Sequence, residues 1–350
     1  MREEIDRRRF LKASAQGVAI AGIAGVAGRI PLVFAETTNK DNPSEWISEV
    51  IREFTATSPL NSLKKTDVGK TGDTPWYVTE ASAVASTKKT DDAEKAWGEE
   101  KAWDTPLVGF ANGGDAVFAD YKDKVGPFHW TPAEIFAMTF PDTPVKPEEL
   151  TVIAWILPTR EAIKADLRKE TKNPAERWVR ARIFGDVFNE ELHRHVAESL
   201  IKAGYPAVAP TMNKEFKTQN SEKYGLASNW SERHAAYAAG LGTFGLCDGL
   251  ITAKGKAMRC GAVVAKMPAT PTPRPYTDHH AYCLHYAKGT CGICIARCPG
   301  KAVTKEGHDK TACYKQLGVT AQYAKEHFGI DGYGCGFCQT ATPCESRIPV

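Results

Sequence analysis

Eight cysteines gather near the end of the chain, where their spacing could hold redox-active metal. Cys291, Cys294 and Cys298 follow at intervals of three and four residues, and Pro299 comes directly after them. A C-x2-C-x3-C-P ending is typical of chains with two [4Fe–4S] clusters, in which the last cysteine binds the other cluster. The sequence therefore predicts two [4Fe–4S] clusters, whose metal ligands are Cys283, Cys291, Cys294, Cys298, Cys313, Cys335, Cys338 and Cys344.

Zinc and disulfides are the alternatives for the same cysteines. A zinc site built from four cysteines also uses C-x2-C pairs, and an exported chain would favour disulfides. Zinc needs neither the Cys-Pro ending nor eight ligands within 62 residues. Disulfides within Cys291/Cys294 or Cys335/Cys338 would close loops too small to gain much entropy. The pattern therefore favours the clusters over both alternatives.

The first 35 residues resemble a twin-arginine export signal. Arg7-Arg8 form the pair and residues 9–12 read Arg-Phe-Leu-Lys, although Asp6 replaces the usual Ser or Thr. The Ala/Gly-rich run over residues 13–28 is too short and too weakly apolar for a stable transmembrane span. Small residues around 33–35 suit a processing peptidase, and an uncleaved anchor is the alternative. We expect a protein of the periplasm or of the outer face of the cytoplasmic membrane.

Composition and charge are those of an ordinary globular protein. The chain has 350 residues, of which 42% are hydrophobic and 25% charged, with a formal net charge of +3. Beyond residue 35, 39 basic residues balance 39 acidic ones. Nothing in this balance suggests a polyanionic partner, so we expect no nucleic-acid binding.

Apolar spacing and capping residues predict the elements that position these groups. Short apolar runs indicate strands at 106–111, 151–157 and 207–209, and a further strand containing Cys260. Helices are expected to begin at Asn42-Pro43, Pro132, Asn173-Pro174 and Ser231, because Asn and Ser are good N-caps and Pro suits the first turn. The Asn173 helix should end at Gly204.

A second marker stretch lies upstream of the cysteines, where an alanine-rich helix leads into Gly240, Gly242 and Gly245. Small residues let a backbone or a flat ligand approach closely. Tight packing of helix on sheet is the alternative explanation. The glycines follow a helix, so they do not form a dinucleotide-binding fingerprint.

Together these stretches resemble one protein superfamily. Glu232-Arg233, the glycine run, Leu250-Ile251-Thr252 and the cysteine motifs are similar to those of epoxyqueuosine reductases and reductive dehalogenases. The likeness covers roughly residues 105–345 and is strongest over 230–344. It implies an α+β fold, with a nitroreductase-like α/β core and a C-terminal ferredoxin-like domain that carries two [4Fe–4S] clusters. We expect the parts to be 1–35 (signal), 36–104 (N-terminal extension), 105–270 (corrinoid and substrate core) and 271–350 (iron–sulfur domain).

The resemblance also implies how the cysteines are shared. Cys291, Cys294 and Cys344 match ligands of the family's first cluster, but Lys288 stands where its first cysteine is usual, so Cys283 is the expected substitute. Cys298, Cys313, Cys335 and Cys338 would bind the second cluster. The gap between Cys338 and Cys344 is longer than usual. Cys247 and Cys260 are left over, and Cys260 is expected in the core.

The resemblance implies a corrinoid, cobalamin, bound near Gly240, Gly242 and Gly245. The acidic proton donor of the tRNA-modifying reductases is replaced by Leu226 here. Tyr224, His234 and Tyr237 are nearby alternatives, and Tyr237 is the catalytic candidate.

The implied function is that of an exported iron–sulfur oxidoreductase similar to reductive dehalogenases. Two clusters would pass electrons to the corrinoid, which would reductively cleave a bond of a small-molecule substrate. The electrons would come from a donor protein or a quinol-linked donor, with peripheral membrane association through that partner. An electron-transfer protein without corrinoid or substrate of its own is the alternative, and a corrinoid carrier without turnover is a third.

Overall fold

The computed structural model describes residues 42–66 and 91–350, apart from Tyr224. The proposed export signal at residues 1–35 and most of the linker behind it lie outside these residues. In the described part of the chain, no helix is both long enough and apolar enough to cross a membrane.

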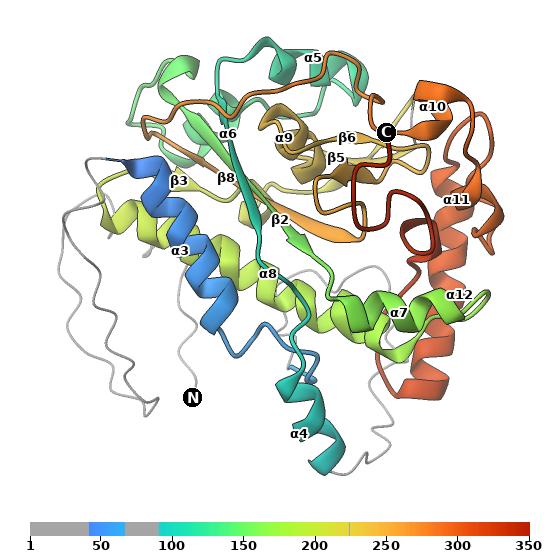
Figure 1. Ribbon diagram of the computed structural model, residues 1–350. Coiled ribbons are helices and arrows are strands. Elements are labelled where there is room, and N and C mark those ends of the chain that lie inside the picture. Colours follow the sequence, from blue (N-terminus) through green and yellow to red (C-terminus); the bar gives the residue numbers. More distant parts are fainter. Residues whose placement is uncertain (1–41, 67–90, 224) are drawn as a thin grey trace.

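A four-stranded antiparallel sheet forms the centre of the molecule (Figure 1). Its order is β1 (Leu107–Asn112), β2 (Thr151–Pro158), β8 (Met258–Ala265) and β3 (Ala207–Val208). Every residue of β2 is buried. A continuous apolar run is what a central strand covered on both faces requires, and this explains the run over 151–157.

Helices cover both faces of this sheet (Figure 1). Ile153 and Trp155 of β2 pack into one core with α3 (Pro43–Thr57), α7 (Glu161–Lys169) and α8 (Glu176–Lys202). Val152 and Ala154 face the other core, built with α5 (Ala116–Lys124), α6 (Pro132–Thr139) and α9 (Glu232–Ala238). Successive side chains of a strand point to opposite faces, so one strand serves both cores.

Helix ends follow local capping chemistry, with one difference from the sequence prediction. The side chain of Asn42 accepts a hydrogen bond from the amide of Glu45, and Thr131 with Glu134 forms a complete capping box. The helix expected to begin behind Asn173 begins instead at Glu176, so the Asn173 cap is wrong. The first helical bond runs from the Val179 amide to the Ala175 carbonyl, which makes Ala175 the cap.

The other elements include two short hairpins and the helices that carry the cysteines. Two hairpins pair β4 (Thr218–Ser221) with β5 (Gly225–Ser228) and β6 (Gly242–Phe244) with β7 (Leu250–Thr252). The remaining elements are α4 (Asp91–Glu99), η2 (Pro147–Glu149), η3 (Pro210–Met212), α10 (Leu284–Lys288), α11 (Ile293–Ala296), α12 (Lys310–Phe328) and η4 (Phe337–Gln339).

The mixed α/β class expected from the sequence is confirmed. The nitroreductase-like core, the ferredoxin-like domain and the four-part division stay predictions. Helix α3, which lies inside the expected N-terminal extension, packs into the same core as α8 and β2.

Candidate metal centre

Four of the eight predicted ligands line one small cavity. They are Cys283, Cys291, Cys294 and Cys344. Cys283 is the residue before α10, Cys294 lies in α11, and Cys344 belongs to the loop near the C-terminus. Lys288 ends α10 with its side chain exposed. The cavity therefore brings together the residues expected for one cluster, Cys283 included.

Among the other four predicted ligands, Cys335 lies within electrostatic reach of Cys298, Cys313 and Cys338. Burial raises the pKa of Cys335 to about 12, and the negative charges of Cys313 and Cys298 add to this shift. The hydrogen bond with Cys247 and burial raise the pKa of Cys338 well above its ordinary value, and the charge of Cys335 adds to this shift. Three of these residues come from different segments: the turn after α11, helix α12 and the loop around η4.

The donor chemistry of the first group fits an iron–sulfur cluster. All ten cysteines fall within the described residues and are free thiols. In the same part of the chain, no three His, Cys, Asp or Glu side chains are grouped so that they could hold one metal ion. Four free thiols on one cavity are the donor set by which a chain binds a four-iron cluster.

Cys247, which the sequence leaves unassigned, lies beside the predicted ligands. It is buried on the β6–β7 turn and packs in one cluster of side chains with Cys283 and Cys294. Hydrogen bonds from Cys294 and Cys338 and the positive charge of Lys256 lower the pKa of Cys247, against the effect of burial. The Nζ of Lys256 donates to the Cys247 Sγ at 3.3 Å. Neither Cys247 nor Lys256 belongs to a spacing motif, so the sequence offers no signal for this contact.

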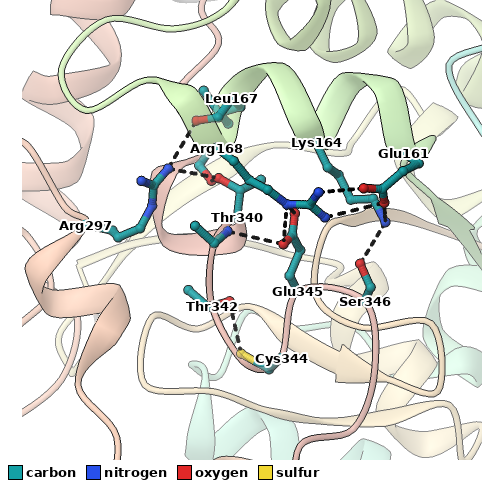
Figure 2. A network of polar contacts seen from close by, with 12 residues as sticks. Glu161, Lys164, Leu167, Arg168, Arg297, Thr340, Thr342, Cys344, Glu345 and Ser346 are labelled. Atoms are coloured by element: carbon teal, nitrogen blue, oxygen red, sulfur yellow. Dashed lines mark hydrogen bonds and ion pairs between the residues drawn. The ribbon is translucent and has the colours of Figure 1, made fainter.

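The loop that carries Cys344 is tied to helix α7 (Figure 2). The Nε of Arg168 donates to both carboxylate oxygens of Glu345, at 2.9 and 3.1 Å. Lys164, one turn earlier, donates to the Ser346 hydroxyl at 2.7 Å. Because these partners follow Cys344 directly, the network sets the position of a predicted ligand.

Arg297, next to Cys298, supplies a second tie in the same region (Figure 2). Its guanidinium donates to the carbonyl of Leu167 at 3.2 Å and to the Thr340 hydroxyl at 3.3 Å. The loop with Cys338 and Cys344 is therefore tied to α7 in two ways. Glu345 and Ser346 bond to α7 directly, and Arg297 bonds both to α7 and to Thr340 of the loop.

The three candidate cofactor-binding glycines face the chain itself. A Cβ at Gly242 would lie 2.3 Å from the carbonyl oxygen of Ile251, and one at Gly240 would lie 2.5 Å from that of Pro273. Gly240 also has a φ of +76°, which favours glycine. At Gly245 the nearest atom is a side-chain carbon of Ile251 at 3.3 Å. Packing of Gly242 in β6 on β7, and of Gly240 on the Pro273 segment, accounts for these two glycines, and binding of a corrinoid beside them stays a prediction.

Tyr237, the catalytic candidate, lies in a buried group of aromatic and charged side chains. Its ring centroid is 5.1 Å from that of Tyr276, and the Arg274 guanidinium lies 6.0 Å from its centre. Arg274 is itself paired with Asp115 at 2.9 Å. Burial raises the pKa of Tyr237 above its ordinary value.

The other donor candidates are placed differently. His234 is half-buried beside Tyr121, and loss of solvation lowers its pKa well below the ordinary value. Leu226 is 45% exposed on β5, and Tyr224 lies outside the described residues. His129 is buried, with Nδ1 3.0 Å from the Trp130 carbonyl.

The Glu232-Arg233 pair of the second marker stretch makes structural contacts. Glu232 lies 2.5 Å from the Nε2 of His193, which is buried on α8. Arg233 donates to the carbonyl of Asp248 at 2.8 Å, in the turn next to Cys247. These contacts join α9 to α8 and to the turn that carries Cys247. Cys260 is buried in β8, as expected.

The fold and the cysteine groups define a mixed α/β protein with a cysteine-rich centre at its C-terminal end. No family model matches the chain, and no curated protein matches it. Solved structures of two kinds of enzyme are similar to it.

The first kind is epoxyqueuosine reductase. A selenomethionine-labelled crystal structure matches at 17% identity and a TM-score of 0.37, over 68% of this chain and 61% of that one. The enzyme from Bacillus subtilis matches at 17% identity and a TM-score of 0.35, over 70% and 62%. The second kind is the catabolic reductive dehalogenase NpRdhA, at 14% identity and a TM-score of 0.43, over 87% and 37%.

The chain thus spans a little over three fifths of the reductases' length and 37% of the dehalogenase's length. Both kinds of enzyme belong to the superfamily that the sequence resembles, and the chain is similar in structure to members of both.

Proposed function

We propose that this protein is an exported oxidoreductase that holds two [4Fe–4S] clusters and passes electrons through them. One observation carries the proposal: Cys283, Cys291, Cys294 and Cys344, from three separate segments, line a single cavity. Bound clusters would supply one-electron transfer. The chain's own part is to hold the thiols in place, through the ties of α7 to the Cys344 loop, and to keep water away from them.

The test is the metal content of anaerobically purified protein. We expect about eight iron atoms and eight acid-labile sulfides per chain, the sum of two four-iron clusters. Stoichiometric zinc without iron would contradict the proposal.

The finer proposal is a corrinoid-dependent reductase that cleaves a bond of a small molecule. It is supported by the sequence resemblance and by the pairing of Tyr237 with Arg274, a tyrosine next to a basic residue. Tyr237 would hold the transferred proton on its phenol oxygen. Corrinoid binding rests on the resemblance alone, so we assign no step to a corrinoid.

The alternative is an electron-transfer protein without a corrinoid, and Leu226 in place of the acidic proton donor favours it. Reconstitution with cobalamin, desalting and cobalt analysis separate the two. About one cobalt per chain with a base-off spectrum supports the reductase. Absence of cobalt from folded, cluster-loaded protein supports electron transfer. Bound cobalt without turnover would indicate a corrinoid carrier.

Export remains part of the proposal, together with a donor protein or quinol-linked donor at the membrane surface. Lysines at positions 7 and 8 keep the charge but lose the guanidinium geometry. We expect the Arg7→Lys, Arg8→Lys double variant to accumulate unprocessed in the cytoplasm. Normal processing of this variant would point to another route.

A further inference from the structure

Lys256 is a buried cation with no carboxylate beside it in the described part of the chain. Lys256 is 2% exposed, and its Nζ donates a hydrogen bond to the Sγ of Cys247 at 3.3 Å. None of the ion pairs among the described residues includes Lys256. A buried ammonium is costly unless negative charge compensates it. The ammonium of Lys256 therefore needs a compensating negative charge that is not a carboxylate of the described residues.

Cysteines of both predicted ligand groups surround Lys256. It lines the cavity shared by Cys283, Cys291, Cys294 and Cys344. Cys338, assigned to the second cluster, packs against the same side-chain cluster as Cys247, whose Sγ lies 3.8 Å from the Cys338 carbonyl oxygen. A single positive charge at this point acts on both groups of thiols.

The chain holds Lys256 in this place through its backbone and its stem. The Lys256 amide donates to the carbonyl of Cys344 at 2.8 Å. Gly255 before it has a φ of +82°, and a Cβ there would lie 2.2 Å from the carbonyl oxygen of Glu345. A Cβ at Gly249 would lie 2.7 Å from the Lys256 Cδ. Gly255 therefore lets the chain turn close to Glu345, and Gly249 leaves room for the aliphatic part of the Lys256 side chain.

We propose that Lys256 sets the reduction potentials of the two [4Fe–4S] clusters by supplying one buried positive charge next to both. This inference rests on the proposed function. Reduction adds one electron, and so one negative charge, to a cluster. A nearby cation stabilises the reduced form more than the oxidised form, and the effect is large where the surroundings are poorly polarisable. Net charge and hydrogen bonds at the sulfurs are established determinants of cluster potential.

The experiment compares Lys256→Met with Lys254→Met in anaerobically purified, cluster-loaded protein. Methionine keeps the stem but removes the charge, and Lys254 is an exposed lysine two residues away. The protein is titrated with dithionite at controlled potential, and the reduced clusters are followed by electron paramagnetic resonance. In Lys256→Met, we expect the reduced-to-oxidised ratio of both clusters at a fixed potential to fall at least tenfold, about 59 mV for one electron. Lys254→Met should leave both potentials unchanged.

Unchanged potentials in a fully loaded Lys256→Met protein would overturn the proposal. If that variant loads no clusters, Lys256→Arg and Lys256→Gln decide the matter. Rescue of iron content by arginine but not by glutamine supports a requirement for positive charge. If neither variant recovers iron, or if Lys256→Gln does, the role of Lys256 is to fill space in the fold, and the proposal is overturned. Wild-type protein without iron would instead refute the proposed function itself.

Discussion

Arg168 of α7 holds Glu345, the residue directly after Cys344, through two hydrogen bonds from one nitrogen, at 2.9 and 3.1 Å (Figure 2). The same guanidinium pairs with Glu161, and the backbone carbonyl of Glu345 accepts from the amides of Lys256 and Ala257. Glu345 is thus held on one side by α7 and on the other by the start of β8. The position of a predicted metal ligand depends on this arrangement.

Substitution of Arg168 should therefore loosen the first cluster. Arg168→Gln leaves the buried carboxylate of Glu345 without its charged partner, at a cost of about 2 kcal/mol. We expect lower iron content, a lower melting temperature and faster loss of iron to a chelator. Lys169→Gln is the control, because Lys169 is exposed and pairs only with Asp166 among the ion pairs of described residues. Equal iron retention in both variants would contradict the role given to Arg168.

Cys283 and Cys247 should respond differently to removal of the thiol. Cys283 lines the cavity with three other predicted ligands, so Cys283→Ala should lose one cluster or convert it to a three-iron form. Cys247→Ala should keep both clusters. Iron and sulfide analysis with electron paramagnetic resonance distinguishes the cases. An unchanged spectrum in Cys283→Ala would show that another residue replaces the ligand missing at Lys288.

The His193–Glu232 pair predicts a dependence of stability on pH. Burial alone would lower the pKa of His193, but Glu232 outweighs it and raises the pKa above the ordinary value of 6.5. A raised folded-state pKa contributes stability that is complete below pH 6.5 and is lost as pH rises through the folded value. The pKa of an unfolded histidine is about 6.5. The difference in melting temperature between wild type and His193→Gln should therefore shrink as the pH rises from about 6 to about 8. A difference that grows over this interval would contradict the assignment.

The glycines of the β6–β7 hairpin should not be equivalent. A methyl group at Gly242 meets the Ile251 carbonyl oxygen at 2.3 Å, and backbone cannot move aside as a side chain can. Gly242→Ala should lower the free energy of unfolding by about 1–3 kcal/mol and reduce cluster content as well. Gly245→Ala meets only the end of the Ile251 side chain and should be tolerated. If Gly242→Ala folds normally with full clusters and loses only cobalamin retention, the corrinoid role of this glycine is supported.

The sequence by itself determined much of the local structure and the number of available thiols. The run over 151–157 became a strand buried on both faces, Asn42 and Ser231 cap helices as expected, and a helix begins at Pro132 as expected. These features depend on neighbouring residues, because side-chain periodicity and capping act within a few positions of the chain. The helix expected from Asn173 began at Glu176, since capping preferences leave the exact boundary open.

Only the tertiary structure decided which groups meet. Cys283 shares a cavity with Cys344, 61 residues away in the sequence, and Arg168 reaches Glu345 from the opposite half of the chain. Lys256 and Cys247 carry no spacing motif, and their contact arises because a glycine turn places the start of β8 against the Cys344 loop. Such contacts depend on how distant segments pack, and the spacing of residues along one segment carries no information about them.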